Sequence, residues 1–446
     1  MPYILNTPDD VTLMLAAIGA GSLHELYAHL PEKIVLQEKL AIGPGLSEYE
    51  VKQKLEALAG QNISFKQCNS FLGAGCYDHY IPAALSTIIS RAEFLTAYTP
   101  YQAENSQGIL QAIYEYQSYM CLLTGMDVSN ASLFDGASGL AEAVLMALRI
   151  TGKRKVVVAG SVHPEYRTTL VTYLSGFDFT IEEVGFTETG LLDLCALQHA
   201  CDDTTACCVF GSPNFFGIIE PGEAIAGIAQ EKKALSVLVT NPLSCVILKS
   251  PSKLGVDIVC GDGQVLGGAM NFGGPSFGFL ATKREFLRQM PGRIVGKTID
   301  KAGNPAYCLT LQAREQHIRR QHATSNICSN QSLNAIAAAL YMAFMGNEGL
   351  ERVATYSLNL AHYLHERIRE VRGVEIVFTA PFFNEFVWKI PAAKKLCACL
   401  REHNIIAGFC MEEAYPSLRD CIVSCCTEKK TKKDIDSFIE ALEHAM

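Results

Sequence analysis

One stretch of the chain decides the fold, and it reads Val256-Asp-Ile-Val-Cys-Gly-Asp-Gly-Gln-Val-Leu-Gly-Gly-Ala-Met-Asn-Phe-Gly-Gly-Pro275. Residues 256–260 predict a buried strand, because they are apolar apart from one Asp. The turn that follows is rich in glycine and leads into a second predicted strand at 277–281. So many glycines indicate a tightly threaded backbone, which is often wrapped around a ligand.

Further predicted strands flank this stretch and alternate with helices. The strands cover 155–159, 179–184, 207–210 and 235–239. Helical patterns cover 106–123, 138–149, 164–175 and 190–201. Short, charge-poor strands that alternate with helices are typical of a parallel sheet covered on both faces. The sequence therefore predicts an α/β fold with a mostly parallel sheet and a ligand site at the carboxyl ends of its strands.

The pattern of predicted helices and strands changes on either side of this region, which predicts three domains. Residues 1–65 form an N-terminal helical extension with capped helices after Thr7, Ser22 and Ser47. Residues 66–330 form the large α/β domain. Residues 331–446 form a smaller C-terminal α+β domain, with helices at 331–345 and 348–371 and strands at 374–379, 385–390 and 421–425. Its last helix starts at Thr431, where Asp434 completes a capping box.

Composition excludes several classes of protein. Of 446 residues 49% are hydrophobic and 19% charged, which is ample for a large core and excludes disorder. The net charge of −9 disfavours nucleic acid as the main partner. Residues 263–282 hold too many glycines for a lipid-facing helix, and residues 11–23 lack the basic flank of a secretory signal. The 17 cysteines include no CxxC pair and no zinc spacing, so we expect reduced thiols, no metal and a cytoplasmic protein.

Three segments carry polar groups where strands meet helices. Gly136, Ala137 and Ser138 open a helix, where backbone N–H groups make either an anion cradle or simply a tight packing turn. His163 follows the strand at 155–159 and either faces the site or caps the next helix. Asn241 follows the strand at 235–239, where a carboxylate would pair with a cationic ring nitrogen, but its amide carries no charge.

Motifs in a fixed order along nearly the whole chain carry a resemblance to a known family. They are Met14-Leu-Ala-Ala-Ile-Gly19, Ser22-Leu-His-Glu-Leu26, Phe71-Leu-Gly-Ala-Gly-Cys-Tyr-Asp78, Phe94-Leu-Thr-Ala-Tyr-Thr-Pro-Tyr-Gln-Ala-Glu104, Ser106-Gln-Gly, Met290-Pro-Gly-Arg-Ile-Val-Gly296, Arg314-Glu-Gln-His-Ile-Arg-Arg320 and Ala323-Thr-Ser-Asn-Ile-Cys328. With them the chain resembles the P-protein of the glycine cleavage system, glycine dehydrogenase (decarboxylating), and in particular subunit 1 (alpha), the N-terminal half of a split P-protein.

The resemblance implies a fold, a reaction and partners. The fold is that of the type I enzymes that use pyridoxal phosphate (PLP). The reaction is decarboxylation of glycine by glycine dehydrogenase (aminomethyl-transferring), with the aminomethyl group passed to the lipoyl arm of H-protein. Such chemistry needs a lysine that holds PLP, helped by an acidic group on the ring nitrogen.

The chain departs from the family at both of these positions. In the catalytic half of the family a His-Lys precedes a Gly-Gly-Pro turn, and counting back from Gly273-Gly-Pro275 places Gln264 at the lysine. Glutamine forms no Schiff base, and Asn241 stands where type I enzymes keep the pairing Asp. The resemblance thus implies a vestigial pocket of Gly136, Ala137, Ser138, His163, Asn241 and Gln264, with no covalent cofactor and no catalytic residue on this chain.

By analogy with the family, the chain completes an active site held by a beta subunit that carries PLP, in a cytoplasmic α2β2 heterotetramer. The proposed wall of that site is formed by Tyr98, Thr99, Pro100, Tyr101, Gln102 and Glu104; the same motif instead shapes the interface in the alternative interpretation. Two other functions stay open. One is a homodimeric PLP enzyme with an unrecognised lysine, for which the nearest in sequence are Lys249, Lys253 and Lys283. The other is a stand-alone protein that binds a small anion.

Overall fold

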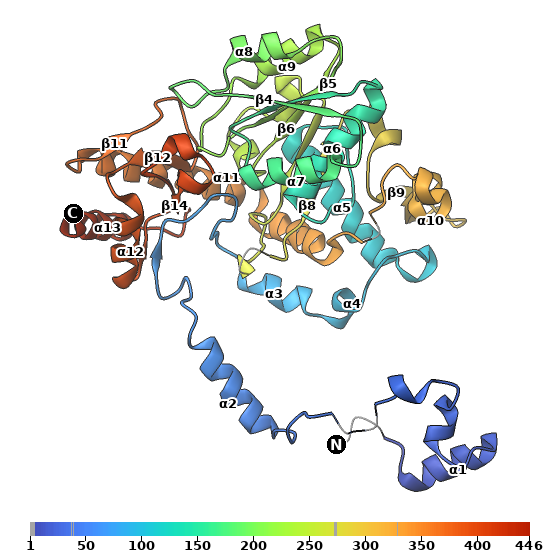
Figure 1. Ribbon diagram of the computed structural model, residues 1–446. Coiled ribbons are helices and arrows are strands. Elements are labelled where there is room, and N and C mark those ends of the chain that lie inside the picture. The colour runs from blue at the N-terminus through green and yellow to red at the C-terminus, as the bar shows by residue number, and fades with distance from the viewer. Residues whose placement is uncertain (1–4, 37, 39, 272–273, 328) are drawn as a thin grey trace. The chain divides into compact units, whose positions relative to one another are not determined.

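The computed structural model describes residues 5–36, 38, 40–271, 274–327 and 329–446. The chain divides into two compact units, Met1–Ile63 and Ser64–Met446, which we call the N-terminal unit and the main unit. Figure 1 shows the elements of each unit in chain order.

The N-terminal unit contains two α-helices, α1 (Pro8–Ile18) and α2 (Glu48–Ala59). Thr7 and Ser47 cap them with complete capping boxes, as the sequence predicted. The predicted helix after Ser22 is a short 3₁₀ helix, Leu23–Tyr27. Every described side chain of this unit is exposed or half-buried, including several large hydrophobic ones. The unit therefore has no hydrophobic core of its own among its described residues.

A seven-stranded sheet forms the centre of the main unit, in the order β2-β8-β7-β6-β5-β3-β4. The strands are β2 (Val128–Ser129), β3 (Lys155–Ala159), β4 (Thr180–Val184), β5 (Thr205–Gly211), β6 (Leu235–Val239), β7 (Ile258–Asp262) and β8 (Gly278–Thr282). β4, β3, β5, β6 and β7 run parallel, whereas β8 is antiparallel to β7. The prediction of a mostly parallel sheet is confirmed.

Helices pack against this sheet, whose strands are largely buried except for the edge strand β4. They are α5 (Gln107–Thr124), α6 (Gly136–Thr151), α7 (Pro164–Leu174), α8 (Leu194–Ala200) and α9 (Gly222–Glu231). α6 contacts β5, β6, β7 and β8, and α9 contacts β5 and β6. The first core joins these elements, with buried side chains such as Val158, Val209 and Val237.

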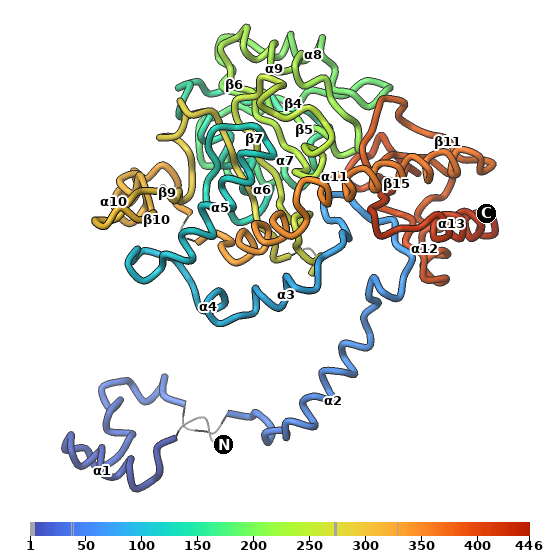
Figure 2. Tube along the Cα trace, turned by 180° about the vertical axis from the view of Figure 1, so that it is seen from behind, coloured from blue at the N-terminus to red at the C-terminus, as the bar shows by residue number. Residues whose placement is uncertain are grey.

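A second core surrounds a four-stranded antiparallel sheet, in the order β11-β12-β15-β14. Its strands are β11 (Glu375–Ile376), β12 (Glu385–Lys389), β14 (Phe409–Cys410) and β15 (Cys421–Cys425). The helices around it are α11 (Ser332–Glu370), α12 (Ala393–Glu402) and α13 (Lys432–Ala445), which lie together in the views of Figures 1 and 2. Thr431 and Asp434 form the predicted capping box of α13.

Helix α11 connects the two cores. Its backbone leaves the helical conformation at Gly346, with φ 58°, which agrees with the two predicted helices at 331–345 and 348–371. Ala338 before this break lies in the first core, and Leu364 after it lies in the second. The division into domains at 66–330 and 331–446 stays a prediction.

Several elements differ from the predictions. Two features were not predicted from the sequence: the hairpin of β9 (Ile294–Ile299) and β10 (Pro305–Thr310), and the short parallel pair of β1 (Asn69–Ser70) and β13 (Ile405–Ile406). Strand β7 starts two residues later than predicted, because the Asp257 carboxylate accepts hydrogen bonds from the backbone N–H and hydroxyl of Ser236. The remaining helices are α3 (Ala83–Ile89), α4 (Ala92–Leu95) and α10 (Gln316–Arg319). No helix of the described part is long and apolar enough to cross a membrane.

Candidate functional site

A cavity lies at the carboxyl ends of four neighbouring parallel strands. His163 follows β3, Asn214 follows β5, Asn241 follows β6 and Gln264 follows β7, and all four line it. Their convergence agrees with the predicted position of the site. The space left in the cavity is about 80 Å³. Typical small-molecule pockets hold about 300–1,000 Å³, so the side chains of this chain already fill most of the site.

The Gln264 side chain is fully engaged by the backbone. Its Oε1 accepts a hydrogen bond from the N–H of Tyr77 at 2.9 Å. Its Nε2 donates to the carbonyls of Tyr77 at 2.9 Å and Gly268 at 2.7 Å. Gln264 is 5% exposed. It therefore locks the segment around Tyr77 over the carboxyl edge of the sheet.

The N-terminus of α6 is occupied by carboxylates of the same chain. Asp135 caps the helix and accepts from the N–H of Ser138 at 2.7 Å. The Oδ2 atom of Asp262 accepts from the N–H of Gly136 at 3.2 Å, and its Oδ1 accepts from the N–H of Gln264 at 2.8 Å and from the Ser276 hydroxyl. Burial raises the pKa of Asp262, and these hydrogen bonds oppose that rise. The N–H groups of Gly136 and Ser138 in the predicted cradle are thus bonded to carboxyl groups of the same chain.

Tyr166, on α7, fills the space between this helix end and His163. Its ring stacks on the imidazole of His163 with 4.8 Å between centroids. A Cβ atom at Gly136 would lie 2.1 Å from the Tyr166 hydroxyl, so only glycine permits this approach. Close packing around Gly136 was one of the two interpretations left open by the sequence.

His163 also caps α7, as its alternative interpretation held. Its Nδ1 accepts from the N–H of Glu165 at 3.2 Å, so Nε2 carries the hydrogen and donates to the carbonyl of Ala74 at 3.1 Å. Burial lowers the pKa of His163. The ring is therefore held neutral, with one face against Tyr166.

Asn241 contributes a neutral amide to the cavity. Its Oδ1 accepts from the N–H of Leu243 at 3.0 Å. Its Nδ2 is buried and has no hydrogen-bond partner in the described part of the chain. This position holds no carboxylate that would favour a protonated ring nitrogen.

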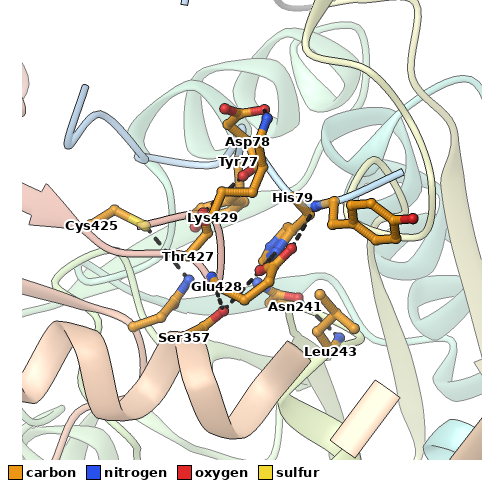
Figure 3. A network of polar contacts seen from close by, with 12 residues as sticks. Tyr77, Asp78, His79, Asn241, Leu243, Ser357, Cys425, Thr427, Glu428 and Lys429 are labelled. Atoms are coloured by element: carbon orange, nitrogen blue, oxygen red, sulfur yellow. Dashed lines mark hydrogen bonds and ion pairs between the residues drawn. The ribbon is translucent and has the colours of Figure 1, made fainter. Parts of the chain in front are cut away.

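Residues 69–80, which we call the covering segment, cross the cavity and are fixed at both ends. The Glu385 carboxylate accepts from the N–H of Ala74 at 2.5 Å and from the Tyr77 hydroxyl at 2.7 Å. Burial raises the pKa of Glu385 to about 7. Further along, His79 Nδ1 lies 2.7 Å from an oxygen of Glu428, and both side chains are at most 10% exposed. Figure 3 shows the contact of His79 with Glu428, which ties this end of the segment to the residues that follow β15.

The proposed wall, Tyr98 to Glu104, lies outside the lining of this cavity. Tyr98 is 72% and Tyr101 is 51% exposed, whereas Pro100 is buried. Gln102 and Glu104 are exposed, and Thr99 accepts a hydrogen bond from the N–H of Tyr101 at 2.9 Å.

Residues of this wall contact two other motifs of the family resemblance, 290–296 and 314–320. Arg293 donates to the Tyr101 hydroxyl at 3.0 Å and lies over its ring. The His317 ring meets the edge of Tyr101 with 5.6 Å between centroids. The Tyr98 hydroxyl lies 2.5 Å from the Ser329 hydroxyl. We call these five residues the tyrosine surface.

Sequence reasoning missed Asp262, Tyr166 and Glu385 as residues of the site. Asp262 stands two residues before Gln264 in the quoted stretch, and Tyr166 stands three residues after His163, so proximity in sequence was an available signal. Glu385 is the first residue of β12 in the four-stranded sheet, and no local signal linked it to the cavity. Gly273 and Cys328, which belong to two of the quoted motifs, lie outside the described residues.

Comparison with known proteins shows the family to which the chain is similar. A family model described as glycine cleavage system P-protein matches residues 1–442. A probable glycine dehydrogenase (decarboxylating) subunit 1 of Carboxydothermus hydrogenoformans is 48% identical over 442 residues, covering 99% of each chain. The corresponding protein of Thermotoga maritima is 47% identical over 443 residues, again covering 99% of each chain.

Solved structures agree with this placement. A crystal structure of glycine decarboxylase (P-protein) of the glycine cleavage system, in inhibitor-bound form, is 40% identical and matches with a TM-score of 0.92 over 100% of both chains. A sphingosine-1-phosphate lyase of Burkholderia pseudomallei shares the fold alone, with a TM-score of 0.68 and 15% identity over 92% of each chain. The architecture is that of the type I PLP-dependent enzymes, as predicted.

Within that class, the chain belongs to the glycine cleavage system P-protein family. The resemblance found in the sequence is thereby confirmed.

The fold implies PLP, but the residues of this cavity do not fit it. The cofactor's phosphate needs free N–H groups at a helix end, and here Asp262 and Asp135 hold those of Gly136 and Ser138. A second negative group beside these carboxylates would be repelled. The aldehyde needs an amine, and none of Lys249, Lys253 and Lys283 lines the cavity.

Proposed function

We propose that this chain is the alpha subunit of a glycine decarboxylase of the glycine cleavage system. The assembled enzyme decarboxylates glycine and passes the aminomethyl group to the lipoyl arm of H-protein. PLP is bound by a partner subunit, and this chain completes the partner's site while its own cavity stays closed. The names of its relatives, which call them subunit 1, support the existence of a second subunit.

The filled cavity is the observation that carries this proposal. The Gln264 amide is hydrogen-bonded to the covering segment, and the Asp262 carboxyl group is hydrogen-bonded to the start of α6. Both contacts are internal, so this chain has neither the amine nor the anion site of a cofactor-binding subunit. They also disfavour a self-sufficient homodimer and a stand-alone anion-binding protein, because each of these needs the same pocket to be open.

The tyrosine surface supports the second half of the proposal. Tyr98 and Tyr101 expose large aromatic rings, yet their hydroxyls are held by Ser329 and Arg293. Exposed rings with fixed orientation are suited to wall a site on a neighbouring chain, because little side-chain freedom remains to be lost on contact. Thr99, Pro100, Gln102 and Glu104 complete the proposed wall, and the Thr99 carbonyl accepts from the N–H of Tyr101. The assembly we propose is a cytoplasmic α2β2 heterotetramer.

Reconstitution with the partner subunit tests the wall. The variants Tyr98→Phe and Tyr101→Phe remove only a hydroxyl, and each should lower glycine decarboxylation about tenfold if that hydroxyl assists the transition state by about 1.4 kcal/mol. Tyr356→Phe, on an exposed tyrosine of α11, is the matched control and should leave the rate unchanged. Unchanged rate and affinity in both test variants would discard direct contact with substrate or cofactor.

A separate experiment tests where the cofactor is bound. The isolated chain is mixed with PLP, treated with borohydride and analysed by mass spectrometry, and the assembled complex is treated in the same way. We expect a lysyl adduct on the partner only. A stoichiometric adduct on this chain would overturn the proposed division of labour.

A further inference from the structure

Two pairs of cysteine thiols lie in contact in the main unit. Cys201 and Cys208 have their sulfur atoms 3.0 Å apart, and Cys397 and Cys410 have theirs 3.6 Å apart. Both members of the first pair are at most 3% exposed. In the second pair Cys397 is buried and Cys410 is only half-buried. A solvent-borne reagent therefore has access to the second pair alone.

The second pair joins a helix to the edge of a sheet. Cys397 lies on α12, and Cys410 ends the two-residue strand β14, which is the outermost strand of the four-stranded sheet. A disulfide needs its sulfur atoms at about 2.05 Å, so the pair must close by about 1.5 Å. A short edge strand held by one neighbour allows such a movement more easily than a central strand does.

The two thiols differ in their electrostatic surroundings. The hydrogen bond with Cys397 and the charges of Lys394 and Arg401 lower the pKa of Cys410 to about 7, against burial and the charge of Glu413. The same hydrogen bond and burial raise the pKa of Cys397. These surroundings make Cys410 the more acidic thiol of the pair, with Cys397 beside it. A reactive thiolate next to a second thiol is the arrangement found in redox-sensitive sites.

We propose that Cys397 and Cys410 form an oxidant-reactive dithiol, which peroxides convert to a disulfide. The Cys410 thiolate attacks one oxygen of hydrogen peroxide, the O–O bond breaks, and hydroxide leaves a sulfenic acid on Cys410. The Cys397 sulfur then attacks the Cys410 sulfur, the S–O bond breaks, and the proton from Cys397 leaves with the oxygen as water. Two thiols are oxidised and one peroxide is reduced to two waters. This site is independent of the function proposed above.

Limited oxidation of the full chain tests the proposal. The protein is exposed to substoichiometric hydrogen peroxide at pH 7, free thiols are alkylated, and peptides are mapped by mass spectrometry. Cys195 is the control, because it is exposed and no contact with another thiol is described for it. Because Cys410 lies in contact with Cys397 and its pKa is lowered, Cys410 should react several-fold faster than Cys195. The product should be a peptide pair joined through 397 and 410.

Two conservative variants make the outcome decisive. Cys397→Ser should abolish the disulfide and leave a sulfenic acid on Cys410 that dimedone traps. Cys410→Ser should leave Cys397 in its reduced form. Circular dichroism establishes that both variants are folded. Oxidation of Cys410 no faster than that of Cys195, or a Cys201–Cys208 disulfide forming first, would overturn the proposal.

Discussion

The hydrogen bonds of Gln264 give the sharpest prediction for stability. The change Gln264→Ala removes three neutral hydrogen bonds, two to Tyr77 and one to Gly268, from a site that is 5% exposed. Each such bond contributes about 1 kcal/mol net, and a buried partner left unpaired costs about 1–3 kcal/mol more. We therefore expect the free energy of unfolding of the main unit to fall by at least about 3 kcal/mol.

Urea unfolding measures this loss. The fluorescence of Trp388 follows the second core, because it is the single tryptophan of the chain and lies there fully buried. Far-ultraviolet circular dichroism follows the whole main unit. The control is Gln111→Ala, since Gln111 is exposed on α5 and bonds only Glu115 on the same helix. It should change the free energy by less than about 0.5 kcal/mol.

Limited proteolysis gives a second readout of the same change. Without Gln264 the covering segment loses a main attachment, so cleavage within residues 72–80 should accelerate in the Gln264→Ala variant and not in the control. A loss of stability below about 1 kcal/mol, with cleavage unchanged, would refute the view that Gln264 locks the segment over the cavity.

Three further predictions concern the same region. Burial raises the pKa of Glu385 to about 7, so the protonated side chain stabilises the fold fully below about pH 4.5 and this contribution is lost as pH rises to 7. The free energy of unfolding of the Glu385→Gln variant should therefore fall by about 3 kcal/mol less over this pH range than that of the original protein. An unchanged pH profile in urea titrations would contradict this prediction. His79→Ala removes one contact of the buried Glu428, whose carboxylate keeps hydrogen bonds from the N–H of Tyr80 and the hydroxyl of Ser357, and should cost about 1–3 kcal/mol by urea unfolding; a cost equal to that of the surface change would show the pair to be unimportant. Gln264→Lys should not create a PLP site, because Asp262 still occupies the end of α6; a borohydride-stable adduct at position 264 would show that the lysine alone was missing.

Much of the fold follows from local patterns in the sequence. Strand β6 and strand β15 have the predicted bounds, because short, mostly apolar runs without charged residues mark them clearly. The capping boxes at Thr7, Ser47 and Thr431 fix three helix starts to the residue. The hairpin of β9 and β10 was missed, because its strands are only partly buried and one carries the Met290–Gly296 motif, which was noted for its resemblance rather than its conformation.

The position of the site could be predicted from the sequence, but the contacts of Asp262 and Glu385 within it could not. Strand order places the residues after β3, β5, β6 and β7 together, so His163, Asn241 and Gln264 could be expected to meet. That Asp262 turns back onto α6 depends on the path of a glycine-rich turn, and turns of this kind have no periodic signal. That Glu385 reaches the cavity depends on how the second core packs against the first, which is a long-range property of the chain.

The carboxyl group of Asp262 at the start of α6 affects how the stability of the chain depends on the supply of cofactor. An enzyme that binds a vitamin-derived cofactor gains stability from it by mass action and loses that protection when the vitamin is scarce. Here the Asp262 carboxyl group, which the polypeptide itself supplies, accepts the hydrogen bond of the Gly136 N–H at the helix end. We therefore expect the melting temperature of the purified chain to be independent of added vitamin B6.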